Sequence, residues 1–172
     1  PCPAQFAWAQ TVGLVPAAVN IHTIRCCIDY LETLAVVDTA RIAVMGHSFG
    51  CYMAVLATAV EPRIKTIVAS GFVCSMSGYY GRTWTCGSQV VPGLFNYGDI
   101  ADVACLIAPR PILVITGLQD CVTPAPFAMA AFKKIETAYS AAGASERAQQ
   151  FVFDGNHIFQ PEAAINWLKQ WL

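Results

Sequence analysis

Charged residues are scarce in this sequence. Asp, Glu, Lys and Arg make up 12% of the 172 residues, and the net charge is −1. No basic run occurs, so no general attraction to nucleic acid or to an anionic membrane surface is expected. The hydrophobic share of 56% lies on the apolar side of the usual globular balance. A large part of this apolar surface must therefore be buried.

Long uninterrupted apolar runs are also missing. Glycine, proline, arginine or aspartate interrupts the apolar stretches before they reach 18 residues, so no membrane span is predicted. The start, Pro1-Cys2-Pro3, has no methionine, no basic region and no cleavage pattern of a signal peptide. A cytoplasmic location is therefore favoured, and a chain beginning at proline is expected to be processed or cut from a longer one.

Metal-ligand spacings are absent too. The eight cysteines form no CxxC pair and, with the histidines, match no zinc pattern, so no metal site is predicted. Cys74 and Cys86 flank a loop rich in glycine and aromatic residues and are a candidate disulfide in a secreted protein, but pairing cannot be read from sequence. Four cysteines lie in apolar, helix-like stretches and are expected to be small buried hydrophobes, namely Cys26, Cys27, Cys51 and Cys105.

What the sequence does contain is an alternation of apolar strands and helices. Residues 20–35 place isoleucine and leucine at steps of three and four, which predicts an amphipathic helix with Asn20 as its cap. Short, continuously apolar segments are typical of strands buried on both faces, and they occur at 41–45, 64–69, 112–116 and 150–153. Further helices are predicted at 49–60, 99–106, 124–142 and 161–172.

This alternation predicts an α/β fold, in which helices cover both faces of a mostly parallel sheet. The length fits one domain, residues 1–172. Residues 1–19 yield no confident strand and stay unassigned. Residues 71–108 are expected to form an irregular excursion near the site, because long ordered loops are usually functional. Four strands at most are expected, with the strand at 41–45 at an edge of the sheet.

The sequence Gly46-His47-Ser48-Phe49-Gly50 carries the clearest chemical signal. This G-x-S-x-G motif lies between a predicted strand and a predicted helix, which is the context of a nucleophile elbow. Glycine on either side allows the strand and the helix to approach closely. The start of the helix adds N–H groups and a positive dipole end near a developing oxyanion. Ser48 is therefore predicted to be the nucleophile and the Phe49 N–H an oxyanion donor.

Two further residues complete a predicted triad. Asp120 follows a predicted strand, at the edge of an open α/β sheet where sites form, although an aspartate before a proline-containing loop is also common in turns. His157 follows the last predicted strand, and it remains as the base once the other two histidines are set aside. The chain order Ser48, Asp120, His157 is the order of the α/β-hydrolase fold.

Alternatives exist for the acid and the base. Asp99, Asp102 and Asp154 compete with the predicted acid, but the first two open a helix, where capping explains them. His47 adjoins the nucleophile, so it is expected to point away from it and to support the site from behind. His22 lies in the first predicted helix and is expected to be structural or at the surface.

Three segments, GHSFG, APRPILVITGLQDCVTP and DGNHIF, resemble the dienelactone hydrolase and acetyl-esterase branch of the α/β-hydrolases. The resemblance spans residues from about 20 to 172. It implies an α/β-hydrolase fold, carboxylic ester substrates and no cofactor, with Ser48, Asp120 and His157 as nucleophile, acid and base. Dienelactone hydrolases proper use a cysteine nucleophile, so plain ester hydrolysis is the closer expectation for a serine.

One departure from this branch concerns the N-terminal part. Its members carry several strands and an oxyanion-forming loop before the helix that corresponds to residues 20–35. Here 19 residues precede that helix, and no HGGG-like sequence supplies a second oxyanion donor. The fold is therefore expected to be minimal or N-terminally truncated.

These observations predict a serine carboxylic-ester hydrolase that forms an acyl-enzyme and favours short-chain esters. A prolyl-oligopeptidase-like serine peptidase and a non-catalytic hydrolase-like module for binding or dimerisation stay open as alternatives. Besides a small ester substrate, the expected partners are a second copy of the chain or missing N-terminal strands. Aromatic residues of the excursion are candidates for the substrate pocket, with ordinary core packing as the alternative: Phe72, Tyr79, Tyr80 and Trp84.

Overall fold

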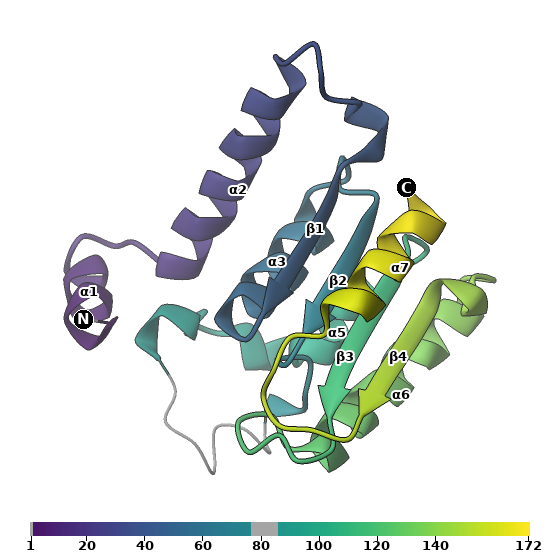
Figure 1. Cartoon of the computed structure of the whole chain (residues 1–172). Coiled ribbons are helices and arrows are strands. Elements are labelled where there is room, and N and C mark those ends of the chain that lie inside the picture. Colours follow the sequence, from purple (N-terminus) through teal and green to yellow (C-terminus); the bar gives the residue numbers. More distant parts are fainter. Residues whose placement is uncertain (1, 77–85) are drawn as a thin grey trace.

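The computed structural model describes residues 2–76 and 86–172 (Figure 1). Its four strands are all parallel, and β1 lies at an edge of the sheet, as the sequence predicts; their order is β1-β2-β3-β4. The strands are β1 (Ala43–His47), β2 (Thr66–Ser70), β3 (Ile112–Gly117) and β4 (Ala148–Phe153). The helices are α1 (Cys2–Thr11), α2 (Pro16–Glu32), α3 (Phe49–Val60), α5 (Ile100–Cys105), α6 (Ala125–Ala141) and α7 (Pro161–Trp171).

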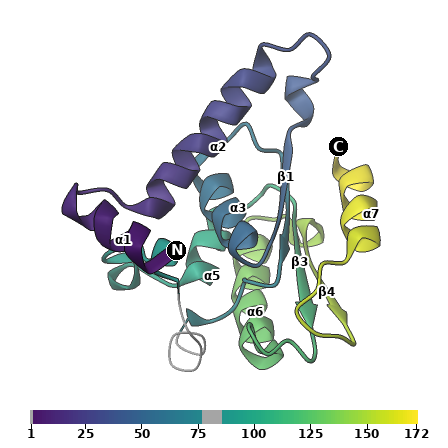
Figure 2. The same cartoon turned by 60° about the vertical axis from the view of Figure 1, so that its left-hand side comes forward.

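Helices cover both faces of the sheet. Figure 2 shows α3, α5 and α6 on one side of the strands and α7 on the other. The two central strands, β2 and β3, are buried at every residue, which explains their continuously apolar sequences. The larger core lies between the sheet and α3, α5 and α6, and a smaller one surrounds Trp167 under α7. This layered arrangement confirms the predicted fold class.

Helix α3 lies inside the molecule, with the sheet on one side and α2 on the other (Figure 1). Every residue from Cys51 to Thr58 is buried, as expected for a helix that is apolar all round. Its end is fixed by Arg110, whose guanidinium donates to the backbone carbonyl oxygens of Thr58 at 2.6 Å and of Glu61 at 2.9 Å. Helix α3 therefore forms a rigid support for the turn that precedes it.

The N-terminal helices differ from the prediction. Helix α2 begins at Pro16, inside its first turn, where a missing N–H costs no hydrogen bond. Asn20 therefore lies within the helix, and its predicted role as the cap is wrong. Residues 2–11, which the sequence leaves unassigned, form α1. The Phe6 side chain of this helix packs so closely against Gly87 that a Cβ on Gly87 would lie 2.5 Å from Cγ of Phe6.

Two of the four cysteines that were predicted to be buried are exposed. Cys26 and Cys27 are exposed, because α2 meets the protein through the stripe that contains the buried Ile28 and both thiols lie off that stripe. Cys51 is buried as predicted, and Cys105 is partly buried.

The stretch after β2 is irregular where the structure describes it, with two 3-10 turns at Gly87–Gln89 and Leu94–Asn96. Cys74 is a buried free thiol here, whereas Cys86 is disulfide-bonded. The candidate pairing of these two cysteines is therefore wrong, since Cys74 lies in the core behind the sheet.

No single helix in residues 2–76 and 86–172 is long and apolar enough to cross a membrane. Two consecutive helices, Ala4–Thr11 and Pro16–Glu32, meet the criteria together by length and composition only, with a bend of 90° between them.

Candidate active site

Ser48 occupies the turn between strand β1 and helix α3. Its backbone has φ 57° and ψ −124°, and within the described ranges it is the one non-glycine residue with a positive φ. Such a conformation costs on the order of 1–3 kcal/mol and persists only where the surrounding structure enforces it. The Ser48 N–H donates to the Ser70 carbonyl oxygen at 2.8 Å, so the strained residue is tied directly to the neighbouring strand.

The glycines of the motif contribute unequally to this turn. A Cβ on Gly46 would lie 2.2 Å from the carbonyl oxygen of Gly50 and 2.7 Å from the nitrogen of Cys51. The strand and the helix can therefore approach only because residue 46 has no side chain. A Cβ on Gly50 would meet nothing within 4 Å, so close approach does not explain the second glycine.

Asp120 lies in the loop after β3 and is 5% exposed. One carboxylate oxygen accepts hydrogen bonds from the backbone N–H groups of Val122 and Thr123, both at 2.8 Å. The other accepts from the Thr123 hydroxyl and from Nδ1 of His157, again both at 2.8 Å. The turn therefore holds the carboxylate in one orientation, with one oxygen directed at the imidazole.

His157 lies in the loop after β4, which runs beside the loop after β3. A Cβ on Gly117 would lie 2.6 Å from the carbonyl oxygens of Gly155 and Asn156, so the two loops touch through their backbones. The N–H of His157 donates to the Asn156 side chain at 2.8 Å. Its Nε2 is buried and has no hydrogen-bond partner among the described residues. That nitrogen is the free acceptor of the Asp120–His157 pair.

His47 contacts this pair through the ring of His157. Its ring centroid is 4.6 Å from that of His157, with the two rings tilted by 41°. Its Nδ1 lies 3.0 Å from the Ser70 hydroxyl. The contact follows from the sheet register, in which His47 pairs with Ser70 at the ends of β1 and β2.

Electrostatics favour a charged acid beside a neutral His47. Burial alone would raise the pKa of Asp120, but hydrogen bonds from Thr123, His157 and Val122 outweigh it and hold that pKa below its ordinary value. Burial lowers the pKa of His47, and the neighbouring His157 lowers it further, against an opposite effect of the Asp120 charge. Asp120 is therefore ionised and His47 neutral near pH 7.

The structure joins two of the three predicted triad residues by a direct hydrogen bond, Asp120 and His157. Ser48 lies next in the chain to His47, whose ring touches His157. The competing acids have other partners: Asp99 and Asp102 form a capping box at the start of α5, and Asp154 accepts from Gln119 at 2.8 Å.

The aromatic residues predicted for the substrate pocket are only partly described. Phe72 is 1% exposed and packs against Tyr52 with ring centroids 5.0 Å apart, within the larger core. Tyr79, Tyr80 and Trp84 lie outside the described residues. A cavity of about 410 Å³ is lined by Tyr52 and by residues 89–96. A pocket role for these aromatic residues stays a prediction.

Sequence reasoning missed three residues that shape the site. Thr123 donates two hydrogen bonds to Asp120. Its position three residues after an aspartate is the spacing of a capping interaction, so the sequence contained a signal for this contact. Ser70 and Gly71 contact the two histidines only because β1 and β2 are in register, which no local pattern reveals. No group of three or more His, Cys, Asp or Glu side chains suited to a metal ion occurs in the described part of the chain.

Comparison with known proteins identifies relatives of most of the chain. The sequence model of the prolyl oligopeptidase family matches residues 6–172. The Bacillus subtilis (strain 168) protein named "Putative hydrolase YtaP" is 27% identical over 170 residues, which is 93% of this chain and 56% of that protein. The chain thus spans little more than half of that relative's length.

Solved structures share the fold at low sequence identity. A "putative acetyl xylan esterase" from Bacteroides fragilis superposes with a TM-score of 0.81 at 16% identity, over 97% of this chain and 51% of that one. A carbohydrate esterase family 15 glucuronoyl esterase from Caldicellulosiruptor kristjansonii gives 0.72 at 19% identity, over 86% and 47%. The predicted α/β-hydrolase fold is confirmed, and the chain spans about half the length of these structures.

Proposed function

The chain belongs to the prolyl oligopeptidase family of α/β-hydrolase serine hydrolases, and from this premise we propose that it cleaves small carboxylic esters through an acyl-enzyme. The observation that carries the proposal is the 2.8 Å hydrogen bond between Nδ1 of His157 and Asp120, together with a serine on a strained strand-to-helix turn whose neighbour His47 contacts the ring of His157. This arrangement offers a nucleophile, a base and a group that orients the base, which is what acyl transfer by a serine requires.

The first step is attack by the Ser48 hydroxyl oxygen on the ester carbonyl carbon. Nε2 of His157 takes the hydroxyl proton, and this nitrogen has no hydrogen-bond partner among the described residues. The ionised Asp120 fixes the tautomer with its proton on Nδ1 and stabilises the imidazolium that forms. The imidazolium then returns the proton to the departing alkoxide as the C–O bond breaks, which leaves an ester on Ser48.

The developing oxyanion needs hydrogen-bond donors, and we assign one of them to the N–H of Phe49. Helix α3 begins at Phe49, so this N–H lies in the first turn and has no partner within the helix. It also lies at the positive end of the helix dipole. Removal of a single such donor costs on the order of 10²–10³ in kcat.

The second half-reaction hydrolyses the acyl-enzyme. His157, neutral again, takes a proton from water as the water oxygen attacks the acyl carbon, and it then protonates Ser48 as the acid departs. The same three side chains thus serve both half-reactions, and no cofactor is needed.

We further propose that short acyl chains, from acetyl to butyryl, are the favoured substrates. The motivating observation is that the described residues between β2 and β3 include no long helix: they hold two 3-10 turns and the six-residue helix α5. Such short elements offer little apolar surface for a long acyl chain. Hydrolysis of palmitoyl esters faster than acetyl esters would contradict this preference.

A serine peptidase is the second candidate, because the family that matches residues 6–172 is that of the prolyl oligopeptidases. The two functions share the triad and differ in the leaving group, an alcohol or an amine. Peptide p-nitroanilides, with proline or another residue before the scissile bond, separate them from p-nitrophenyl esters.

The test is labelling with a fluorophosphonate, followed by turnover of p-nitrophenyl acetate. We expect the wild-type chain to be labelled and the Ser48→Ala variant to be unlabelled, with a fall of about 10⁶ in kcat and an unchanged circular dichroism spectrum. Labelling of a different serine, or wild-type turnover by Ser48→Ala, would remove the basis of the proposal. Rapid cleavage of peptide anilides with no ester turnover would favour the peptidase.

A further inference from the structure

We propose that His47, the residue before the nucleophile, is a positioning residue: its ring is the wall against which the imidazole of His157 rests. The proposal deepens the proposed function and rests on it, because it assigns a role within the same site. His47 exchanges no proton with the substrate. It acts through His157, by restricting where Nε2 of that ring can point.

The contact between the two rings is direct. Their centroids are 4.6 Å apart and their planes are inclined by 41°, which is within the range of aromatic contacts. The side chain of His157 is 18% exposed, so most of its surface is covered. The face that His47 covers is therefore closed to movement of the base.

His47 is itself held from two directions. Its Nδ1 lies 3.0 Å from the Ser70 hydroxyl, at the end of a fully buried strand. The ring of Phe159 meets it edge-on, with centroids 6.2 Å apart and an inclination of 69°. A wall anchored to a central strand can resist displacement of the base, which a surface side chain could not.

Gly71 shows how tightly the two rings are packed. Its φ is +68°, and a Cβ there would lie 3.0 Å from Cε1 of His157 and 3.1 Å from Cε1 of His47. The backbone after β2 therefore passes beside both imidazoles at once. A glycine is needed for the backbone angle and for the space alike.

A wall is needed because one hydrogen bond does not fix a ring. The bond from Nδ1 to Asp120 leaves the imidazole free to turn about the Nδ1···Oδ2 line, which swings Nε2 away from the nucleophile. Misplacement of a reacting group by about 1 Å can cost on the order of 10² in rate. Contact with His47 removes this freedom.

The charge state of His47 suits the role. The ionisable groups that act on it are the His157 ring and the Asp120 carboxylate, and the balance of burial and these charges lowers its pKa. A neutral ring can lie against the His157 imidazolium that forms during catalysis, whereas a charged ring would repel it.

Two substitutions separate the ring from its hydrogen bond. His47→Phe keeps an aromatic ring and loses the bond to Ser70 and the hydrogen bond with the His157 backbone. His47→Gln can keep that bond but has no ring. We expect His47→Gln to lower kcat on p-nitrophenyl acetate about tenfold with KM changed less than about twofold, and His47→Phe to retain most of the wild-type kcat. His22→Gln, which removes the exposed histidine of α2, is the matched control and should match wild type.

The opposite order of the two kcat values would overturn the proposal. If His47→Gln were active and His47→Phe impaired, the role of His47 would depend on its bond with Ser70 and not on its ring. Equal activity of both variants with wild type would overturn it as well. If His47→Gln does not fold, Ser70→Ala replaces it. This variant leaves the ring but loosens its anchor, and a kcat equal to wild type would then count against the wall.

A second readout does not depend on turnover. The proton on Nδ1 of His157, which is shared with Asp120, can be followed by proton NMR. We expect a narrow signal in wild type and in His47→Phe and a signal broadened by ring motion in His47→Gln. If the protein neither hydrolyses esters nor reacts with fluorophosphonate, the proposed function fails, but this comparison still decides whether His47 restrains His157.

Discussion

Both carboxylate oxygens of Asp120 accept hydrogen bonds from its own turn, so its orientation does not depend on His157 alone. The bond to His157 uses a lone pair on the oxygen that also accepts from the Thr123 hydroxyl. An asparagine at position 120 would present an amide whose NH₂ group cannot accept from Nδ1 of the imidazole. The tautomer of His157 depends on this difference.

Asp120→Asn should lower kcat by about 10⁴, because the proton then moves to Nε2, the nitrogen that has to accept. Thr123→Val removes one hydroxyl bond to the carboxylate and should have a much smaller effect, about tenfold or less. Both are measured as kcat on p-nitrophenyl acetate with the fold checked by circular dichroism. If Asp120→Asn keeps a tenth of the wild-type rate, Asp120 is not the acid of the triad.

The pH dependence of kcat/KM should show one histidine-like step. The base has to be neutral to accept the Ser48 proton, so kcat/KM should rise with pH as the base loses its own proton. Asp120, whose pKa is lowered, is already ionised there and adds no second step. A flat profile between about pH 5 and 9 would speak against a histidine base.

His47 should also make the stability of the fold depend on pH. Its pKa is lower in the folded protein, so below about 6.5 the unfolded chain binds a proton that the folded chain does not. The free energy of unfolding therefore falls as the pH drops from about 6.5 towards the folded pKa. Urea unfolding at pH 8 and pH 5 should show a smaller loss in His47→Phe than in wild type or in the His22→Gln control. An equal loss in all three proteins would mean that His47 titrates normally.

The sequence indicated the positions of Ser48, Asp120 and His157 because each follows a recognisable strand, and carboxyl ends of parallel strands meet at one edge of a sheet. The contact between His47 and His157 could not be predicted from the sequence. That contact depends on the register of β1 against β2 and on the path of the loop after β4, both of which are set by packing over long sequence separations.

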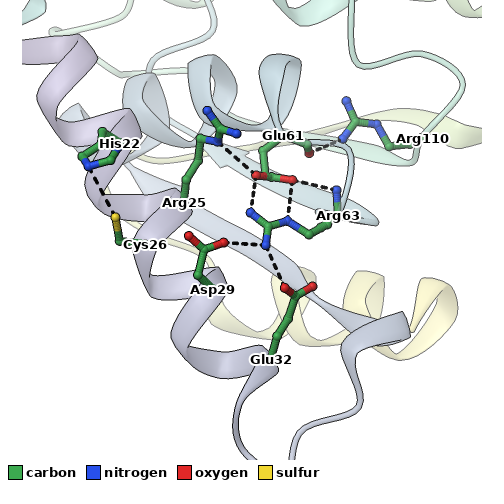
Figure 3. Close-up of polar contacts among 8 residues, drawn as sticks. All are labelled: His22, Arg25, Cys26, Asp29, Glu32, Glu61, Arg63 and Arg110. Atoms are coloured by element: carbon green, nitrogen blue, oxygen red, sulfur yellow. Dashed lines mark hydrogen bonds and ion pairs between the residues drawn. The ribbon is translucent and has the colours of Figure 1, made fainter.

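Helix α2 is attached to the body of the protein by a cluster of ion pairs, which Figure 3 shows. Glu61, 2% exposed, lies just after α3 and accepts two hydrogen bonds from the Arg63 guanidinium, at 2.8 and 2.7 Å. Arg63 also reaches Asp29 at 2.6 Å and Glu32 at 2.8 Å on α2, and Arg25 of that helix reaches Glu61 at 3.3 Å. Glu61 and Arg63 therefore bridge α2 to the turn between α3 and β2.

Removal of Glu61 should weaken this attachment strongly. Hydrogen bonds from Arg63 lower the pKa of Glu61 to about 2, against the effect of burial, so the pair contributes stability above the unfolded pKa of about 4.3, and this is lost as the pH falls towards about 2. Glu61→Gln should cost about 3 kcal/mol at pH 7, since it removes the buried carboxylate that Arg63 and Arg25 share. Glu146→Gln, at a solvent-exposed pair with Arg147, should cost less than about 0.5 kcal/mol. Urea denaturation measures both, and equal costs would show that the cluster does not anchor α2.

Element boundaries were predictable where apolar pattern and packing agree. Helix α3 spans residues 49–60 as expected, and the strands differ from their predicted bounds only at the ends. Helix α1 was missed because the apolar residues of CPAQFAWAQT follow no helical repeat. Its packing depends instead on Phe6 meeting Gly87, a contact between segments that are far apart in sequence.

At the scale of the whole molecule, the sheet has two open edges, β1 and β4. Strand β1 differs from the central strands because its residues are partly exposed and Met45 is 54% exposed. No described strand pairs with its outer side, which leaves backbone N–H and C=O groups available to another chain. Lysine or proline, which commonly protects an edge strand, is absent from Ala43–His47.

We therefore expect the 172-residue chain to associate rather than to remain a monomer. An unprotected apolar edge is a template for pairing, and the charge that usually keeps such surfaces apart is scarce, at 12% of the residues. Sedimentation velocity at micromolar concentration should show dimers or larger species of the wild-type chain. Met45→Lys, which places a charge at the exposed residue of β1, should shift the population to monomer, whereas Ile165→Lys at an exposed site on α7 should not. A wild-type chain that sediments as a monomer would contradict pairing at β1, and monomers produced equally by both variants would point to general solubility instead of this edge.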